Sequence, residues 1–153
     1  MSNELILAIS GNDIFSGGGL HADLATYTTN KQHGFVAVTC LTAMTEHGFE
    51  VIPVDPTTFA QQLNSLKDVP FSAIKLGLLP NVEVADLALD YVKAHAEIPV
   101  VLDPVLVCKE SHERRIEYNK TLATEALKEA KKHTSISAGN NVTVTTSTNA
   151  AGG

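Results

Sequence analysis

Short apolar runs alternate along this chain with stretches in which apolar residues recur at helical spacing, and this alternation restricts the fold more than any other feature. Strand-like runs lie at residues 5–9, 35–41, 73–78 and 99–102. Helical spacing follows the first three runs, at residues 20–27, 55–66 and 84–91. Strands and helices in this order form parallel βαβ units. The sequence therefore predicts an α/β fold with a mainly parallel sheet. We expect residues 35–41 to be buried on both faces and Gly34 to end the first helix.

The character of the sequence changes near residue 110. Residues 119–133 have the spacing of one more helix, and residues 142–146 have strand propensity. The last twenty residues carry no charged side chain and consist mostly of Ser, Thr, Asn, Ala and Gly, a bias that says little about structure. We therefore divide the chain into residues 1–109 and residues 110–153, the second part being a divergent or incomplete continuation of the same domain.

Charge and hydropathy argue against several kinds of partner. The formal net charge of −6 disfavours nucleic acids and acidic membranes, which select basic surfaces. The sequence holds no apolar run of the roughly 18 residues that a membrane-spanning helix needs. Residues 1–4 lack the basic start of a signal peptide, so we expect a cytoplasmic protein. Cys40 and Cys108 have no CxxC spacing, and we expect both to stay reduced.

Three polar or glycine-rich segments follow predicted strands, at residues 11–19, 42–48 and 103–109. Ligands of open α/β sheets bind beyond the carboxyl ends of the strands, so these segments together predict a ligand site. The glycines of residues 11–19 leave two interpretations open. They either present amide groups at a helix start to an anion or a polar ring, or merely permit a tight turn. The segment matches neither of the two common glycine-rich nucleotide motifs.

Two aspartates are candidates for this site. Asp23 lies at the edge of the apolar stripe of the first helix, where it either faces a pocket or interacts with the helix N-terminus; the residues alone favour the helix interaction. Asp103 directly follows an apolar strand and precedes Pro104. A carboxylate there suits a cation or phosphate neighbourhood, or serves as a simple cap. The histidines have no HExxH or similar spacing, and no Ser-His-Asp or Cys-His arrangement can be argued.

Taken together, these segments resemble the pyridoxal kinase and hydroxymethylpyrimidine kinase branch of the ribokinase superfamily. Five stretches match that branch in order: GNDIFSGGGLHAD at 11–23, VTCLTAMTEHGF at 38–49, FAQQL at 59–63, IKLGLL at 74–79 and VLDPVLV at 101–107. The matches lie within residues 4–109, about seven-tenths of the chain. Each stretch is weakly specific by itself, and their shared order is what makes the resemblance specific.

The resemblance implies a ribokinase-like three-layer αβα fold, incomplete in this chain, with residues 1–109 as its substrate-binding part. It implies transfer of the γ-phosphoryl group of ATP to a hydroxymethyl group, assisted by Mg²⁺, in a protein that forms a homodimer. The implied substrate-binding residues are Gly11, Asp23, Met44, Leu78 and Val105, and Asp103 would lie near the metal or the phosphates. The glycine-rich motif that carries the catalytic base in the family does not occur here, so the catalytic residues stay unidentified.

Met44 favours one substrate within the branch. Pyrimidine kinases resemble one another in having Gln at this place, which can pair with an aminopyrimidine edge, whereas a thioether suits a pyridine face better. Residues 107–109, Val-Cys-Lys, also look like those of Gram-positive-type pyridoxal kinases. We therefore expect phosphorylation of pyridoxal, pyridoxine or pyridoxamine. The alternatives are a hydroxymethylpyrimidine or phosphomethylpyrimidine kinase of thiamine synthesis, and a non-catalytic ligand-binding fragment that lacks the ATP half.

Overall fold

The computed structural model describes residues 4–103, 134–138 and 142–146, and these form one sheet of six strands with helices on both faces. The sheet has the order β2-β1-β5-β6-β7-β8. Its strands are β1 (Leu5–Ser10), β2 (His33–Val38), β5 (Ala73–Leu76), β6 (Val100–Leu102), β7 (Thr134–Ala138) and β8 (Val142–Thr146). All neighbours are parallel except β7 and β8, which confirms the predicted mainly parallel sheet.

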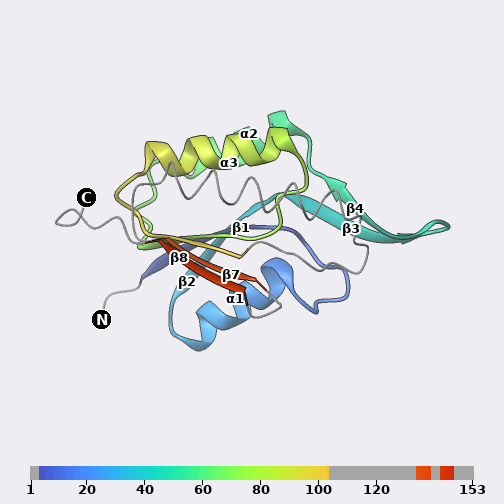
Figure 1. The fold of residues 1–153 in the computed structure, drawn as a ribbon, viewed down its shortest axis with the longest axis horizontal. Coiled ribbons are helices and arrows are strands. Elements are labelled where there is room, and N and C mark those ends of the chain that lie inside the picture. The colour runs from blue at the N-terminus through green and yellow to red at the C-terminus, as the bar shows by residue number, and fades with distance from the viewer. Residues whose placement is uncertain (1–3, 104–133, 139–141, 147–153) are drawn as a thin grey trace.

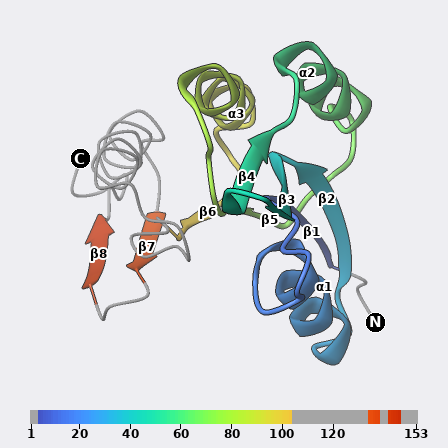
Figure 2. The ribbon, with the colours of Figure 1, turned by 90° about the vertical axis from the view of Figure 1, so that its right-hand side faces the viewer.

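The helices make the fold a three-layer sandwich. Helices α2 (Pro56–Ser65) and α3 (Val82–Ala94) lie on one face of the sheet, and α1 (Gly19–Thr29) lies on the other (Figure 1). Figure 2, which turns the molecule by 90°, shows the same layers and places β7 and β8 at the end of the sheet away from β2. The predicted three-layer αβα arrangement is therefore confirmed. The helix predicted at residues 119–133 lies outside the described residues.

The main core lies between the sheet and the pair α2 and α3. Phe59 of α2 and Val84 of α3 are fully buried, and both belong to one cluster with Ile74 and Leu76 of β5. Full burial of side chains of this size contributes about 1.5–3 kcal/mol each relative to exposure. The helical spacing seen in the sequence therefore reflects one buried face on each of these two helices.

Capping residues fix where α2 and α3 begin. The Asp55 carboxylate accepts hydrogen bonds from the amides of Thr57 and Thr58, at 3.0 and 3.3 Å, and the Asn81 side chain accepts one from Val84 at 2.9 Å. Such caps satisfy amide groups that have no partner in the first turn of a helix. They hold the helices in the register that buries their apolar faces.

Helix α1 packs closely on β2 but buries little. Asp23 is its only buried residue, and a Cβ at Gly34 would lie 2.6 Å from a methyl carbon of Leu24 and 2.9 Å from a ring carbon of Tyr27. The prediction that Gly34 ends the helix is therefore wrong. The helix ends at Thr29, and Gly34 lies within β2, where only glycine leaves room for the two side chains above it.

The prediction that residues 35–41 form one strand buried on both faces is also wrong. This apolar run divides between two elements, because β2 ends at Val38 and β3 (Cys40–Thr45) begins two residues later. β2 is the edge strand of the sheet, and within it only Ala37 is buried. The run is almost wholly apolar because it includes both the end of β2 and the buried start of β3, at Cys40.

The sequence did not predict the antiparallel hairpin of β3 and β4 (Gly48–Pro53), which Figure 1 shows projecting beyond the sheet. Residues 42–48 were expected to be a polar loop. A two-stranded ribbon outside the core buries little surface, as the half-exposed side chains of Leu41, Met44 and Ile52 show. It therefore lacks the clean alternation that identifies a strand.

The part of the chain that the structure describes contains no helix that is both long and apolar enough to cross a membrane.

Candidate functional site

A cavity of about 350 Å³ opens at the carboxyl ends of β1 and β5. Its wall combines the loop after β1, the base of the β3–β4 hairpin, the residues after β5, and Asp103 after β6. These are the places at which the sequence predicted ligand-contacting segments, and the fold brings all three together. The volume lies within the range of roughly 300–1,000 Å³ that is usual for small-molecule pockets.

Close backbone approach shapes the floor of this cavity. A Cβ at Gly11 would lie 2.4 Å from the Cys40 Sγ, and a Cβ at Gly77 would lie 2.7 Å from the Ser10 Oγ. The buried Thr39 hydroxyl donates a hydrogen bond of 2.7 Å to the Leu78 carbonyl oxygen. The ends of β1 and β5 and the segment Thr39–Cys40 are therefore closely packed against one another at the floor of the cavity.

The loop of residues 11–19 is held by its own aspartate. The Asp13 carboxylate accepts hydrogen bonds from the amides of Phe15 and Gly17, at 3.0 and 3.1 Å. Gly19 has a φ of 63°, a conformation that favours glycine. The Gly11 carbonyl oxygen also leaves no room for a side chain there, because a Cβ would lie 2.3 Å from it. Because the Asp13 carboxylate already occupies the amides of Phe15 and Gly17, these two amides are not available to an anionic ligand.

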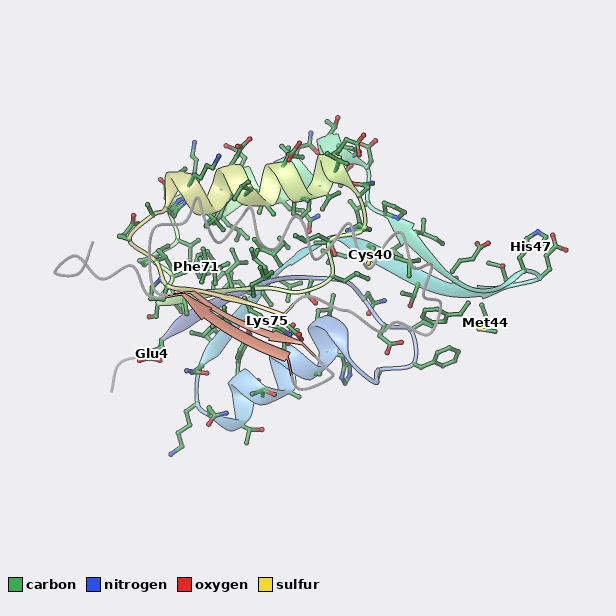
Figure 3. All side chains as sticks on the ribbon, viewed as in Figure 1. Glu4, Cys40, Met44, His47, Phe71 and Lys75 are labelled. Carbon is green, nitrogen blue, oxygen red and sulfur yellow. The ribbon has the colours of Figure 1, made fainter. Side chains whose placement is uncertain are left out.

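A charged pair links the sheet to α1 beside the cavity. The Lys75 ammonium, from the middle of β5, donates a hydrogen bond to the Asp23 Oδ1. Figure 3 shows Lys75 on the side of the sheet that faces α1. The Asp23 side chain is only 8% exposed, and its Oδ2 is buried without a hydrogen-bond partner among the described residues. Burial raises the pKa of the nearby Tyr27 hydroxyl to about 12, with a further contribution from the Asp23 carboxylate.

Asp103 completes the charged group. Burial raises the pKa of its carboxyl, the Lys75 ammonium partly lowers it again, and the Asp23 carboxylate raises it. In the described parts of the chain there is no cluster of three or more His, Cys, Asp or Glu side chains that could hold a metal ion. Mg²⁺, however, is commonly bound by one or two carboxylates together with phosphate oxygens and water. Of the two carboxylates in the cavity wall, that of Asp13 is bonded to the amides of its own loop, and that of Asp103 fits a magnesium ion that takes its other ligands from a phosphate-bearing substrate.

The predicted site residues differ in where the structure places them. Gly11, Leu78 and Asp103 line the cavity. Asp23 does not line the cavity, but it contacts Lys75, which does line it. Met44 is 59% exposed and lies on the projecting hairpin, as Figure 3 shows. Val105 lies outside the described residues. The binding roles expected of these residues stay predictions.

Lys75 is the residue that the sequence analysis missed. The signal was present, since Lys75 is the one charged residue in the apolar run 73–78. A partly buried charged residue in a strand needs a partner, and that partner, Asp23, lies 52 residues away in sequence. No local pattern connects the two.

Comparison with known proteins places these features in a family context. The family model described as "Phosphomethylpyrimidine kinase" matches residues 13–146. The pyridoxine kinase of Bacillus subtilis is 36% identical over 117 residues, which are 74% of this chain and 43% of that protein. The hydroxymethylpyrimidine/phosphomethylpyrimidine kinase of Synechococcus elongatus is 36% identical over 111 residues, 71% of this chain and 42% of that protein. The chain thus spans about two-fifths of the length of these relatives.

Solved structures show the same fold. Pyridoxal kinase from Bacillus subtilis, in an ADP complex, has a TM-score of 0.69 and 25% identity, over 96% of this chain and 73% of that chain. Pyridoxal kinase from Staphylococcus aureus, in complex with AMP-PCP, has a TM-score of 0.68 and 24% identity, over 89% of this chain and 63% of that chain. Phosphomethylpyrimidine kinase from Clostridium difficile 630 has a TM-score of 0.70 and 20% identity, over 95% of this chain and 81% of that chain. Proteins with both substrate names therefore share this fold.

Proposed function

This chain belongs to the phosphomethylpyrimidine kinase family, and on that premise we propose that the protein phosphorylates the hydroxymethyl group of a B6 vitamer with ATP. The observation that carries the proposal is the cavity at the carboxyl edge of the sheet, which combines Leu78 and apolar hairpin residues with the charges of Lys75 and Asp103. A largely apolar pocket with a few directed polar groups is the usual site for a small planar ligand.

The choice of a pyridine ring rests on Met44. Relatives with pyridine and with pyrimidine substrates in their names match this chain about equally well, so the named relatives do not make this choice. A thioether offers a soft apolar contact to a ring face and cannot pair with an aminopyrimidine edge. Since Met44 is 59% exposed on the hairpin, the proposal includes an approach of the hairpin to the bound ring.

The proposed reaction uses ATP and Mg²⁺, and a different observation supports each of them. Structural neighbours are named as complexes with ADP and AMP-PCP, which supports ATP as the phosphoryl donor. Asp103 is the carboxylate that would hold Mg²⁺ next to the phosphates, and the ion would neutralise charge on the transferred group. In phosphoryl transfer such neutralisation and in-line positioning supply most of the rate enhancement. Within the proposal, Gly11, Leu78 and Val105 position the ring, and the catalytic base is unassigned.

Two alternatives have their own support. The family description and the Synechococcus relative favour a hydroxymethylpyrimidine or phosphomethylpyrimidine kinase. Ligand binding without phosphoryl transfer is the alternative of a different class, because all residues proposed to bind the ring lie within residues 1–109. Phosphoryl transfer by the full-length protein, measured with pyridoxine and with hydroxymethylpyrimidine in competition, separates the two kinases, and ATP turnover by residues 1–153 alone separates an enzyme from the ligand-binding fragment. We expect pyridoxine phosphate as the main product; the pyrimidine phosphate alone supports the first alternative, and binding without turnover the second.

We also propose that the protein forms a homodimer in the cytoplasm, where ATP is available. The loop after β1 and the hairpin expose large apolar side chains, among them Ile14 at 55%, Phe15 at 57% and Leu41 at 50%. Phe15 stacks on Phe49 of the hairpin with ring centroids 6.2 Å apart, so the two segments form one surface. Contiguous exposed apolar surface of this kind commonly marks a protein interface. Light scattering should give the mass of two chains, and a monomeric mass at micromolar concentrations contradicts this part of the proposal.

A further inference from the structure

Lys75 is the only basic residue among the described residues that line the cavity. It lies in β5, between the core residues Ile74 and Leu76, and its side chain leaves the sheet on the face opposite to theirs. The side chain is 24% exposed, and it borders the cavity. A strand in the middle of the sheet thus carries an ammonium group to the wall of the proposed substrate site.

The ion pair with Asp23 leaves hydrogen-bonding capacity unused on both sides. An ammonium has three donors, and the one bond that Lys75 makes among the described residues goes to the Asp23 Oδ1. The Asp23 Oδ2 is buried and has no partner there. Burying a pair of charges is costly unless the remaining donors and acceptors are satisfied. The Lys75 ammonium therefore has donors available for a further hydrogen bond, and of the two residues only Lys75 lines the cavity.

Lys75 also stands between two carboxylates. Asp23 bonds it from α1, and Asp103 lies close enough for the Lys75 charge to lower the pKa of its carboxyl. The Asp23 carboxylate thus holds the Lys75 ammonium directly, and the Asp103 carboxylate adds a second negative charge nearby. An ammonium can donate but cannot accept, so a ligand must present an acceptor atom at this point of the wall.

We propose that Lys75 contacts the substrate by donating a hydrogen bond to an acceptor on its ring, and that Asp23 is a positioning residue that acts through Lys75. The inference rests on the proposed function and deepens it. The acceptor in a B6 vitamer is the oxygen of the 3-hydroxyl group on the pyridine ring or the ring nitrogen; an exocyclic amine cannot take this place. The role differs from the direct substrate contact that the family resemblance implies for Asp23.

Calorimetric binding of pyridoxine, and of a matched pyridine that lacks the ring hydroxyl, tests the proposal on the full chain. The variants are Lys75→Met, Asp23→Asn and the two combined, with melting temperature as a check of folding. The combined variant is needed because Lys75→Met alone leaves a buried carboxylate without its cation, which is strongly destabilising. Lys67→Met, at an exposed lysine outside the cavity, is the matched control.

We expect the combined variant to bind pyridoxine roughly ten- to a hundredfold more weakly than the wild type, the loss typical of one hydrogen bond to a charged group. If the 3-hydroxyl oxygen is the acceptor, the analogue without the hydroxyl loses much less affinity in the combined variant; an equal loss for both ligands assigns the contact to the ring nitrogen. Asp23→Asn alone should weaken binding less than the combined variant does, and should add nothing once Lys75→Met is present. Lys67→Met should bind like the wild type.

Three results overturn the inference. If the wild type binds pyridoxine and the combined variant binds it equally well, Lys75 makes no contact, although the proposed function stands. If Asp23→Asn causes the same loss with and without Lys75→Met, Asp23 contacts the substrate directly and does not act through Lys75. If the wild type binds neither ring, the proposed function fails and the inference fails with it.

Discussion

Replacing Gly11 by Ala tests the close packing that forms the cavity floor. The new Cβ would lie 2.4 Å from the Cys40 Sγ, whereas its next neighbours, the Thr39 Oγ1 and the Cys40 carbonyl oxygen, would lie at ordinary contact distances of 3.6 and 3.7 Å. Cys40 is fully buried, so its sulfur has little room to move away. Overpacking of this kind typically costs about 1–3 kcal/mol of unfolding free energy.

Because one atom causes the conflict, a second substitution should relieve it. Cys40→Ala by itself should cost on the order of 1 kcal/mol, through the small void it leaves. Adding Gly11→Ala to Cys40→Ala should then cost almost nothing, although Gly11→Ala alone is clearly destabilising. Gly18→Ala is the matched control, because no atom lies within 4 Å of a Cβ at that position.

Urea unfolding followed by circular dichroism measures these effects. With a slope of about 2 kcal/mol per molar urea, a loss of about 2 kcal/mol moves the midpoint by roughly 1 M. We predict such a shift for Gly11→Ala and a much smaller one for Gly18→Ala. Equal midpoints for Gly11→Ala and the wild type would show that the Cys40 sulfur leaves room for a Cβ at this position. A full, additive loss in the Gly11→Ala, Cys40→Ala double variant would contradict the prediction as well, because the sulfur would then not be the obstacle.

Three other predictions follow from single side chains. The two ring nitrogens of His95 lie 2.9 Å from the Tyr91 carbonyl oxygen and 3.0 Å from that of Lys67, and only a protonated ring can donate to both. Burial lowers the pKa of His95, but these hydrogen bonds and nearby carboxylates outweigh it, so the net pKa is raised. The stabilisation by protonated His95 is therefore fully present below the unfolded pKa of about 6.5 and is lost as pH rises through the higher folded pKa. A His95→Gln variant should lack this loss. If its melting temperature depends on pH as that of the wild type does over this range, the prediction is wrong. Asp55→Ala should lower the unfolding free energy by about 1 kcal/mol through loss of a helix cap, and an unchanged urea midpoint would show that the cap is dispensable. Asp103→Asn in the full-length protein should raise the Mg²⁺ concentration needed for half-maximal turnover by roughly tenfold or more, and an unchanged value would remove Asp103 from the proposed metal site.

The parts of the fold that could be predicted from sequence are those that bury a regular face. α2 and α3 were predicted because Phe59, Leu63 and Val84 recur at helical spacing and are buried in the core. The β3–β4 hairpin was missed because most of its side chains stay partly exposed, so no buried face imposes a period on its sequence. Gly34 was misread because its function is to make room for Leu24 and Tyr27, which a sequence does not show.

The candidate site was predictable in its place but not in its chemistry. Ligand sites of parallel sheets lie at the carboxyl ends of the strands, and the cavity is there, with Gly11, Leu78 and Asp103 in its wall. The pairing of Lys75 with Asp23 depends on how α1 crosses the sheet. Lys75 and Asp23 are far apart in sequence, so no local sequence pattern predicts their contact.

We propose above all that the cavity at the carboxyl edge of the sheet binds the ring of a B6 vitamer. A titration of the isotopically labelled chain with pyridoxine, followed by amide chemical shifts, tests it directly. We predict saturable shifts at Gly11, Gly77 and Leu78, which line the cavity, and none around His95, which lies outside it. Shifts confined to the surroundings of His95, or no shifts at millimolar pyridoxine, would contradict the claim.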